Sequence, residues 1–282
     1  MKEISVKRVE DCISKMVQNI NFEYPSDVLT KLAEGLAKET SKIGKETLQL
    51  LMENAHIAKT ERIPICQDTG MVIVFLKVGQ EVHFVGGSLK EAIEEGVRKG
   101  YQEGYLRKSI VSDPLFDRIN TKDNTPCIIY TDIVDGDMVE IELGCKGFGS
   151  ENMSTITMLK PAQGLEGVKE CVLSAIKKAG PNACPPMVVG VGIGGTFDYA
   201  AVLAKKATLR DCSVANSDAR YATLEKELLM EANALNIGPQ GLKGDVSVLS
   251  INIEHYPTHI AGLPCAVNIS CHATRHIKEV IK

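Results

Sequence analysis

The stretch that most constrains the fold is Met71–Leu76, with the sequence Met-Val-Ile-Val-Phe-Leu. Six successive apolar residues, several of them β-branched, predict a strand that is buried on both faces. Directly before this strand, one turn carries a thiol, an amide and a carboxyl, at Cys66, Gln67 and Asp68. Because a buried strand would hold this turn rigidly, we interpret the three side chains as parts of a functional site.

Helical and strand patterns alternate along the rest of the chain. The first 60 residues are typical of helices, with Ser26 as the cap of the second one, and Ser88 begins a helix that should end near Arg107 and Lys108. Further helices are expected at 164–178, 196–206 and 218–235, and further strands at 127–130, 138–143, 187–195, 246–253 and 264–269. These patterns predict one α/β domain over residues 1–282, a mixed sheet packed with helices, in which a helical flank (1–60) precedes the core (61–282).

The charge balance excludes some partners. The 32 basic and 36 acidic side chains give a formal net charge of −4, which provides no global attraction for nucleic acid or an anionic membrane. The first twenty residues mix charged with apolar positions, and no run approaches the roughly 18 consecutive apolar residues of a membrane span. We therefore expect a cytoplasmic protein, in which an anionic substrate needs a local positive pocket.

Nine cysteines without a secretion signal predict reduced thiols that are buried, metal-bound or reactive. Cys66, Cys184 and Cys271 stand in loops beside polar or proline residues, and a shared metal centre is one interpretation of them. No C-x-x-C pair occurs, so a zinc ribbon does not fit. Cys145 and Cys212 are ambiguous, whereas small buried side chains are expected at Cys12, Cys127, Cys171 and Cys265.

Two glycine-rich stretches could approach an anion. Gly190, Gly192 and Gly195 match G-x-G-x-x-G, but the segment 208–212 that follows the expected helix is short and polar, which disfavours a dinucleotide site. A glycine-lined helix start that faces an anionic ligand, or simple close packing, are the other interpretations. The second stretch, Lys146–Asn152, is expected to be a loop whose main-chain amides can contact an anion.

Four ordered motifs together resemble those of the iron–sulfur, class I fumarate hydratases and the related L-tartrate dehydratases. The motifs are Cys66–Gly70, Lys146–Asn152, Gly192–Thr196 and Cys271–His276, and the resemblance runs from about residue 10 to the C-terminus. It implies that Cys66, Cys184 and Cys271 hold a [4Fe–4S] cluster with one iron open to substrate. It also implies the reversible hydration of fumarate to L-malate, with that iron as a Lewis acid on the C2 hydroxyl.

The resemblance further assigns roles to individual residues. Asp68 would be the catalytic acid that manages the hydroxyl proton, and Gln67 would hold a carboxylate or the hydroxyl. Arg107 and His259 correspond to substrate-binding residues, and a guanidinium suits a carboxylate. Structural alternatives stay open: Asp68 as a turn cap, Arg107 as a surface residue and His259 as a core histidine.

The main-chain amides of Gly147, Phe148 and Gly149 would complete the substrate site. Many single-chain relatives have Gly-Gly-Gly-Ser where this chain has Phe148, so the shape of the pocket is expected to differ. His272 and His276, which flank the third cysteine motif, are expected to have supporting or structural roles.

Single-chain members of the family continue into a second domain, so this chain resembles the α subunit of a two-subunit enzyme. A β subunit is expected to complete the active site for a small dicarboxylate, and the α chain is expected to self-associate. The runner-up activity is that of L-tartrate dehydratase, which yields oxaloacetate. Other classes remain: a non-catalytic iron–sulfur or zinc module with Cys265 or His272 as a fourth ligand, and a nucleotide-dependent oxidoreductase.

Overall fold

The computed structural model describes residues 2–282, which form two compact units. Among the described residues, unit 1 comprises 2–25, 55–147 and 275–282, and unit 2 comprises 26–54 and 148–274. The expected single domain thus consists of two units that each combine helices with a four-stranded mixed sheet, as the predicted fold class requires. Among residues 2–282, no helix is long and apolar enough to cross a bilayer.

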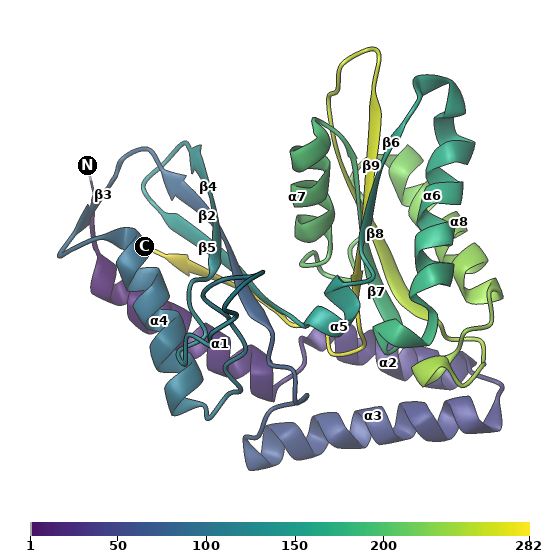
Figure 1. Cartoon of the computed structure of the whole chain (residues 1–282), viewed down its shortest axis with the longest axis horizontal. Helices are drawn as coiled ribbons and strands as arrows, with labels where there is room; N and C mark the ends of the chain where they lie inside the picture. Colours follow the sequence, from purple (N-terminus) through teal and green to yellow (C-terminus); the bar gives the residue numbers. More distant parts are fainter. Residues whose placement is uncertain (1) are drawn as a thin grey trace. The chain divides into compact units, whose positions relative to one another are not determined.

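Unit 1 is built on a sheet with the strand order β10-β5-β2-β4 (Figure 1). The central strand β2 pairs parallel with β4 and antiparallel with β5, which in turn pairs antiparallel with β10. A second, two-stranded parallel sheet joins β1 to β3. The elements are β1 (Lys2–Ser5), α1 (Val6–Phe22), β2 (Met71–Gly79), β3 (Val82–Val85), α4 (Leu89–Glu103), β4 (Ile128–Val134), β5 (Val139–Lys146) and β10 (His276–Ile281).

The core of unit 1 confirms the strand predicted from the apolar run. Val72, Val74 and Leu76 of β2 are buried in one cluster with residues of α1 and α4. Helix α4 begins as expected, since the Ser88 side chain accepts a hydrogen bond from the main-chain N–H of Glu91. It ends at Glu103, earlier than predicted, and Tyr105 has a positive φ of 51° that is incompatible with a continuing helix.

Unit 2 contains a second mixed sheet with the strand order β6-β9-β7-β8. Strand β7 pairs parallel with β8 and antiparallel with β9, and Figure 1 shows α6 and α8 on one face of this sheet and α7 on the other. Helix α3 (Lys42–Glu61) contains the boundary between the units, at residues 54 and 55. The other elements are α2 (Ser26–Lys38), α5 (Phe148–Glu151), β6 (Thr155–Leu159), α6 (Gly164–Ala179), β7 (Met187–Gly194), α7 (Phe197–Ala207), α8 (Ala219–Ala234), β8 (Val248–Tyr256), β9 (Leu263–Ser270) and the 3₁₀ turns η1 (Pro161–Gln163), η2 (Gly180–Ala183) and η3 (Pro239–Gly241).

The G-x-G-x-x-G stretch has a packing explanation in this unit. A Cβ atom on Gly190 would lie 2.1 Å from the carbonyl oxygen of Ala204, and one on Gly192 would lie 2.0 Å from that of Ala200. Both distances are far shorter than any real contact, so these glycines let α7 lie directly on β7. Close packing therefore accounts for the pattern without a nucleotide.

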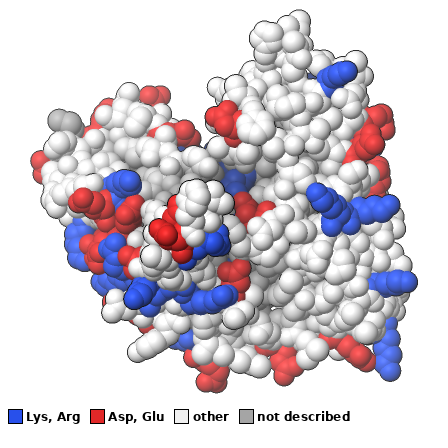
Figure 2. All heavy atoms as spheres, viewed as in Figure 1, with Lys and Arg blue, Asp and Glu red and all other residues white. Residues whose placement is uncertain are grey.

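Several local predictions differ from the structure. The Lys146–Asn152 stretch is not a loop throughout, because residues 148–151 form the short helix α5. In β8 the polar side chains are buried and hydrogen-bonded: Ser250 donates to Asn252, which donates to the carbonyl oxygen of Ala207. Acidic and basic side chains are interspersed on the face shown in Figure 2, in keeping with the small net charge.

Candidate active-site residues

The turn that carries Cys66 and Asp68 is fixed at the start of β2. The Oδ1 atom of Asp68 accepts a hydrogen bond of 3.0 Å from the main-chain N–H of Gly70. Gly70 has a φ of +78°, and a Cβ atom there would lie 2.7 Å from the carbonyl carbon of Lys146. Only glycine satisfies both conditions, so the turn packs directly on the end of β5. The expected capping role of Asp68 is thus present, through its Oδ1 atom.

The buried side chain of Arg275 holds the same turn by a hydrogen bond to its main chain. Arg275 is only 2% exposed, and its Nη2 atom donates a 2.8 Å hydrogen bond to the carbonyl oxygen of Asp68. Its Nη1 atom donates to Oδ1 of Asn21, also at 2.8 Å, and Asn21 accepts from the N–H of Ile65 through its own carbonyl. Asn21 and Arg275 therefore fix both ends of the segment that contains Cys66.

Two further side chains bind the carbonyl groups of this turn. The hydroxyl of Tyr101, which is completely buried, lies 2.8 Å from the carbonyl oxygen of Thr69 and 2.9 Å from that of Gly70. The side-chain amide of Asn124 also donates a hydrogen bond of 3.1 Å to the carbonyl oxygen of Gly70. Burial raises the pKa of Tyr101 well above its usual value, so this phenol stays a neutral donor.

Arg107 is connected to the Cys66 turn through its main chain. The hydroxyl of Thr69 donates a 2.6 Å hydrogen bond to the carbonyl oxygen of Arg107, and the side chain of Arg107 is exposed. Gln67 is also exposed, and Cys66 and Asp68 are half-buried. Unit 1 thus brings an amide, a carboxyl and a thiol onto one accessible turn, and the main chain of Arg107 is hydrogen-bonded to that turn.

Gly147 completes this arrangement at the end of unit 1. A Cβ atom on Gly147 would lie 3.2 Å from the Oδ2 atom of Asp68 and 3.6 Å from Nη2 of Arg275. The missing side chain therefore makes room for the Asp68 carboxylate. The following residues, Phe148 and Gly149, are exposed at the start of α5 in unit 2, and a Cβ atom on Gly149 would meet no atom within 4 Å.

Unit 2 brings the loops of Cys184 and Cys271 together. The main-chain N–H of His272 donates a 3.2 Å hydrogen bond to the carbonyl oxygen of Cys184. Cys184 follows η2 in the left-handed conformation, with a φ of 50°, which costs a non-glycine residue about 1–2 kcal/mol. The hydroxyl of Thr274 donates to the carbonyl oxygen of Cys271 at 2.8 Å. The two loops are therefore hydrogen-bonded to each other at the end of the sheet where β9 ends and β7 begins.

The nine thiols differ in their exposure. Cys184 is exposed and Cys66 and Cys271 are half-buried, whereas Cys127, Cys145, Cys212 and Cys265 are buried. Cys12 and Cys171, which were expected to be buried, are also half-buried. Burial raises the pKa of Cys127 to about 12 and also raises that of Cys212, so these thiols stay protonated. Within residues 2–282, no three His, Cys, Asp or Glu side chains are grouped around a possible metal ion. Cys66 belongs to unit 1 and the other two loop cysteines to unit 2, so their meeting at one centre stays a prediction.

His259 lies at the other end of the unit 2 sheet. It stands in the exposed loop between β8 and β9, where its Nδ1 atom accepts from the N–H of Ala261 at 3.2 Å, so it is not a core histidine. Cys271 directly follows β9, whose eight residues span roughly 27 Å at about 3.4 Å each. Within this unit the structure therefore does not bring His259 together with the two cysteines.

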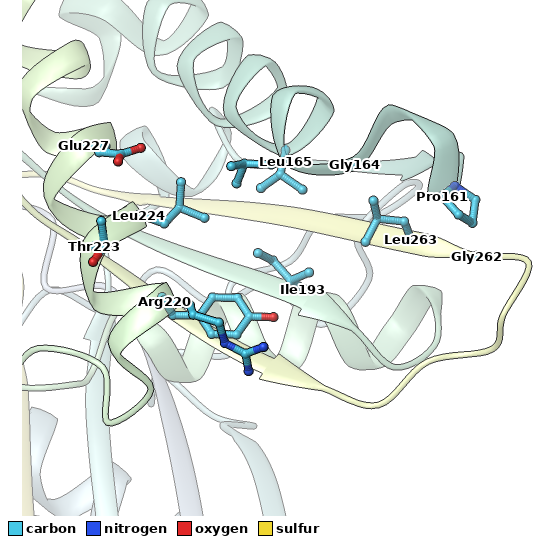
Figure 3. Close-up of a pocket in the computed structure, with 12 residues that line it drawn as sticks. Pro161, Gly164, Leu165, Ile193, Arg220, Thr223, Leu224, Glu227, Gly262 and Leu263 are labelled. Carbon is cyan, nitrogen blue, oxygen red and sulfur yellow. The ribbon is translucent and has the colours of Figure 1, made fainter.

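A pocket of about 740 Å³ lies at this same far end of the sheet (Figure 3). Apolar side chains of α6, α8, β7 and β9 point into it, among them Leu165, Leu224, Ile193 and Leu263, and Arg220 lies at its edge. The Arg220 guanidinium is already paired with Asp218 at 2.5 Å. None of the predicted site residues lines this pocket, so its size does not make it the candidate active site.

Comparison with known proteins places this arrangement in a family. The family model described as fumarate hydratase (Fumerase) matches residues 10–280. The chain is 41% identical over 280 residues, 98% of both chains, to a Methanocaldococcus jannaschii protein named "Putative L(+)-tartrate dehydratase subunit alpha". It is also 35% identical over 281 residues to the L(+)-tartrate dehydratase subunit alpha of Escherichia coli strain K12. That alignment covers 97% of this chain and 91% of the Escherichia coli protein. The chain belongs to the fumarate hydratase family of hydro-lyases.

Sequence reasoning missed the residues that hold the site of this family member in place. Arg275 stands inside the Cys271–His276 motif, Tyr101 lies in the helix expected after Ser88, and Asn21 lies in the helical flank, but the sequence assigns a role to none of them. A buried arginine or asparagine has no local sequence signature, and the contact from Arg275 to Asp68 joins residues 207 positions apart. The one sequence feature that could have indicated the role of Arg275 is its position inside the Cys271–His276 motif.

Proposed function

We propose that this chain is the α subunit of an L(+)-tartrate dehydratase, which removes water from tartrate to give oxaloacetate. The observation that carries this proposal is the near full-length similarity to proteins that are named as tartrate dehydratase α subunits. Fumarate hydration, our first expectation from the sequence, is supported by the name of the matching family model. The names of the relatives favour the runner-up, so fumarate hydration becomes the alternative.

The thiols of Cys66, Cys184 and Cys271 fit the group that the family implies. Iron–sulfur clusters are held by cysteine thiolates, and these three cysteines stand on accessible loops, whereas four of the other six are buried. When bound, a [4Fe–4S] cluster with three protein ligands supplies a Lewis acid for a hydroxyl of the substrate. A non-catalytic module would need a fourth ligand, and Cys265, one of the two candidates, is completely buried in the core of unit 2.

Asp68 is proposed to deliver the proton to the departing hydroxyl. Its Oδ1 atom is engaged by the N–H of Gly70, and its Oδ2 atom lies on the side of Gly147. The hydrogen bond from Arg275 to the Asp68 carbonyl fixes the backbone that carries this carboxyl. Such positioning matters because general acids act only within hydrogen-bond reach of the reacting atom.

The carboxylates of the substrate are proposed to bind Arg107, Gln67 and the amides of residues 147–149. A guanidinium can donate two parallel hydrogen bonds to one carboxylate, and Arg107 has an exposed side chain on a main chain tied to Thr69. His259 stays a proposed substrate-binding residue; it stands in an exposed loop of unit 2, at the opposite end of β9 from Cys271. The second proton of the elimination, on carbon, requires a base that we assign to a β subunit.

Turnover by the α chain combined with its β subunit tests this function. Anaerobically reconstituted protein should form oxaloacetate from L(+)-tartrate with a kcat/KM at least about tenfold above that for L-malate or fumarate, since a site built for the extra hydroxyl rejects a substrate without it. The α chain alone should be nearly inactive. Efficient interconversion of fumarate and malate without tartrate turnover would establish the alternative.

A further inference from the structure

We propose that Lys205 of α7 is a positioning residue that holds α5, and with it the Phe148–Gly149 segment, through an ion pair with Glu151. This inference rests on the proposed function only in that it assigns substrate binding to residues 147–149. The clamp itself consists of residues of unit 2 alone.

The ion pair joins the last turn of α7 to the last residue of α5. The Nζ atom of Lys205 donates to Oε1 of Glu151, and the side chains are only 14% and 26% exposed. The other carboxylate oxygen, Oε2, accepts a 2.9 Å hydrogen bond from Nδ2 of Asn268 in β9. Both oxygens of Glu151 are therefore engaged by side chains from two different elements.

The clamp is located beside the two cysteine loops of unit 2. Asn268 precedes Cys271 by three residues, and its Nδ2 atom also donates to Oγ of Ser154, which accepts from the N–H of Ile269. Helix α5 contacts η2, the turn directly before Cys184. Displacement of Glu151 would therefore move a segment that touches both the Cys184 turn and the strand leading to Cys271.

Packing does not replace the ion pair. A cavity of about 250 Å³ borders Glu151, Lys205 and Asn268, and its other walls include the small side chains of Ala201, Ala204 and Ala266. The Oδ1 atom of Asn268 is buried without a hydrogen-bond partner among the described residues. Burial lowers the pKa of Lys205, and the nearby Glu151 carboxylate opposes that shift. Without the ammonium, Glu151 would lose one of the two side-chain contacts that engage its carboxylate oxygens.

The test compares Lys205→Met with Lys206→Met, the neighbouring lysine on the same helix, in the α chain combined with its β subunit. Lys205→Met should raise the KM for the dicarboxylate about tenfold and change kcat less than about threefold, because it loosens substrate positioning rather than the proton donor. Hydrogen exchange of the amides of residues 148–154 should become about tenfold faster in Lys205→Met. Lys205→Arg should restore most of both properties.

Equal KM values and equal exchange in the Lys205→Met and Lys206→Met variants would overturn the clamp. If Lys205→Met does not fold, Glu151→Gln, which keeps the shape but removes the charge, is measured in the same way with the same expected result. If exchange at residues 148–154 is faster in Lys205→Met but the enzyme turns over neither tartrate nor fumarate, the clamp is supported and the proposed function is wrong. Unchanged exchange in an active enzyme would do the reverse.

Discussion

The guanidinium of Arg275 donates a 2.8 Å hydrogen bond to the main-chain carbonyl oxygen of Asp68. Arg275 directly follows the Cys271–Thr274 segment in the sequence, whereas Asp68 lies two residues after Cys66. One buried side chain thus anchors the proposed proton donor and belongs to the same short motif as the third candidate cysteine.

Arg275→Lys should weaken unit 1. A lysine keeps the charge but loses the fork that reaches both Asp68 and Asn21, so at least one buried carbonyl oxygen loses its partner. The free energy of unfolding in urea should fall by about 2–4 kcal/mol. The exposed Arg118→Lys is the control, and equal stability of the two variants would show that the fork is unimportant.

Tyr101→Phe removes one hydroxyl from the buried contact with the Cys66 turn. The carbonyl groups of Thr69 and Gly70 then share one donor fewer, and we expect a loss of about 1–2 kcal/mol in unfolding free energy. Tyr105→Phe is a matched control, because Tyr105 is 93% exposed, and it should change stability by less than about 0.5 kcal/mol. A loss of similar size in both variants would contradict the assigned role of Tyr101.

Gly147→Ala places a methyl group 3.2 Å from the Oδ2 atom of Asp68. The carboxyl must shift by a few tenths of an ångström, so kcat on the dicarboxylate should fall by about tenfold or more. Gly149→Ala, where the added methyl meets nothing within 4 Å, should lose less activity. The opposite order in steady-state kinetics would show that Gly147 does not control the position of Asp68.

Alkaline pH should destabilise the protein through its buried thiols. The pKa of Cys127 is raised to about 12 in the folded chain from an ordinary value of 9.0, so between these values the unfolded chain has lost this proton and the folded chain has not. The unfolded state then binds fewer protons, and stability falls as pH rises. From pH 9.5 to 11, urea titrations should show a slope shallower by about 1.4 kcal/mol per pH unit in Cys127→Val than in the unchanged chain. Identical slopes would mean that Cys127 is accessible to solvent when folded.

The sequence allowed some features to be predicted because they are local. The apolar run at Met71–Leu76 by itself predicts a buried strand, and the Ser88 cap depends on two residues only three positions apart. The sequence does not predict the short strands β1, β3, β6 and β10, since each owes its formation to pairing with a distant segment. The same limit applies to the site. The motifs identified Cys66, Asp68 and Gly147, whereas Arg275, Tyr101 and Lys205 act through contacts between remote residues.

Iron and acid-labile sulfide per chain, with an EPR spectrum before and after addition of L(+)-tartrate, test the central claim most directly. The anaerobically reconstituted α chain with its β subunit should bind about four irons per α chain, and tartrate should perturb the spectrum more than malate does. Serine at Cys66, Cys184 or Cys271 should abolish this iron, whereas Cys12→Ser should not. Full iron content in all three serine variants, or a spectrum that neither acid changes, would contradict the account.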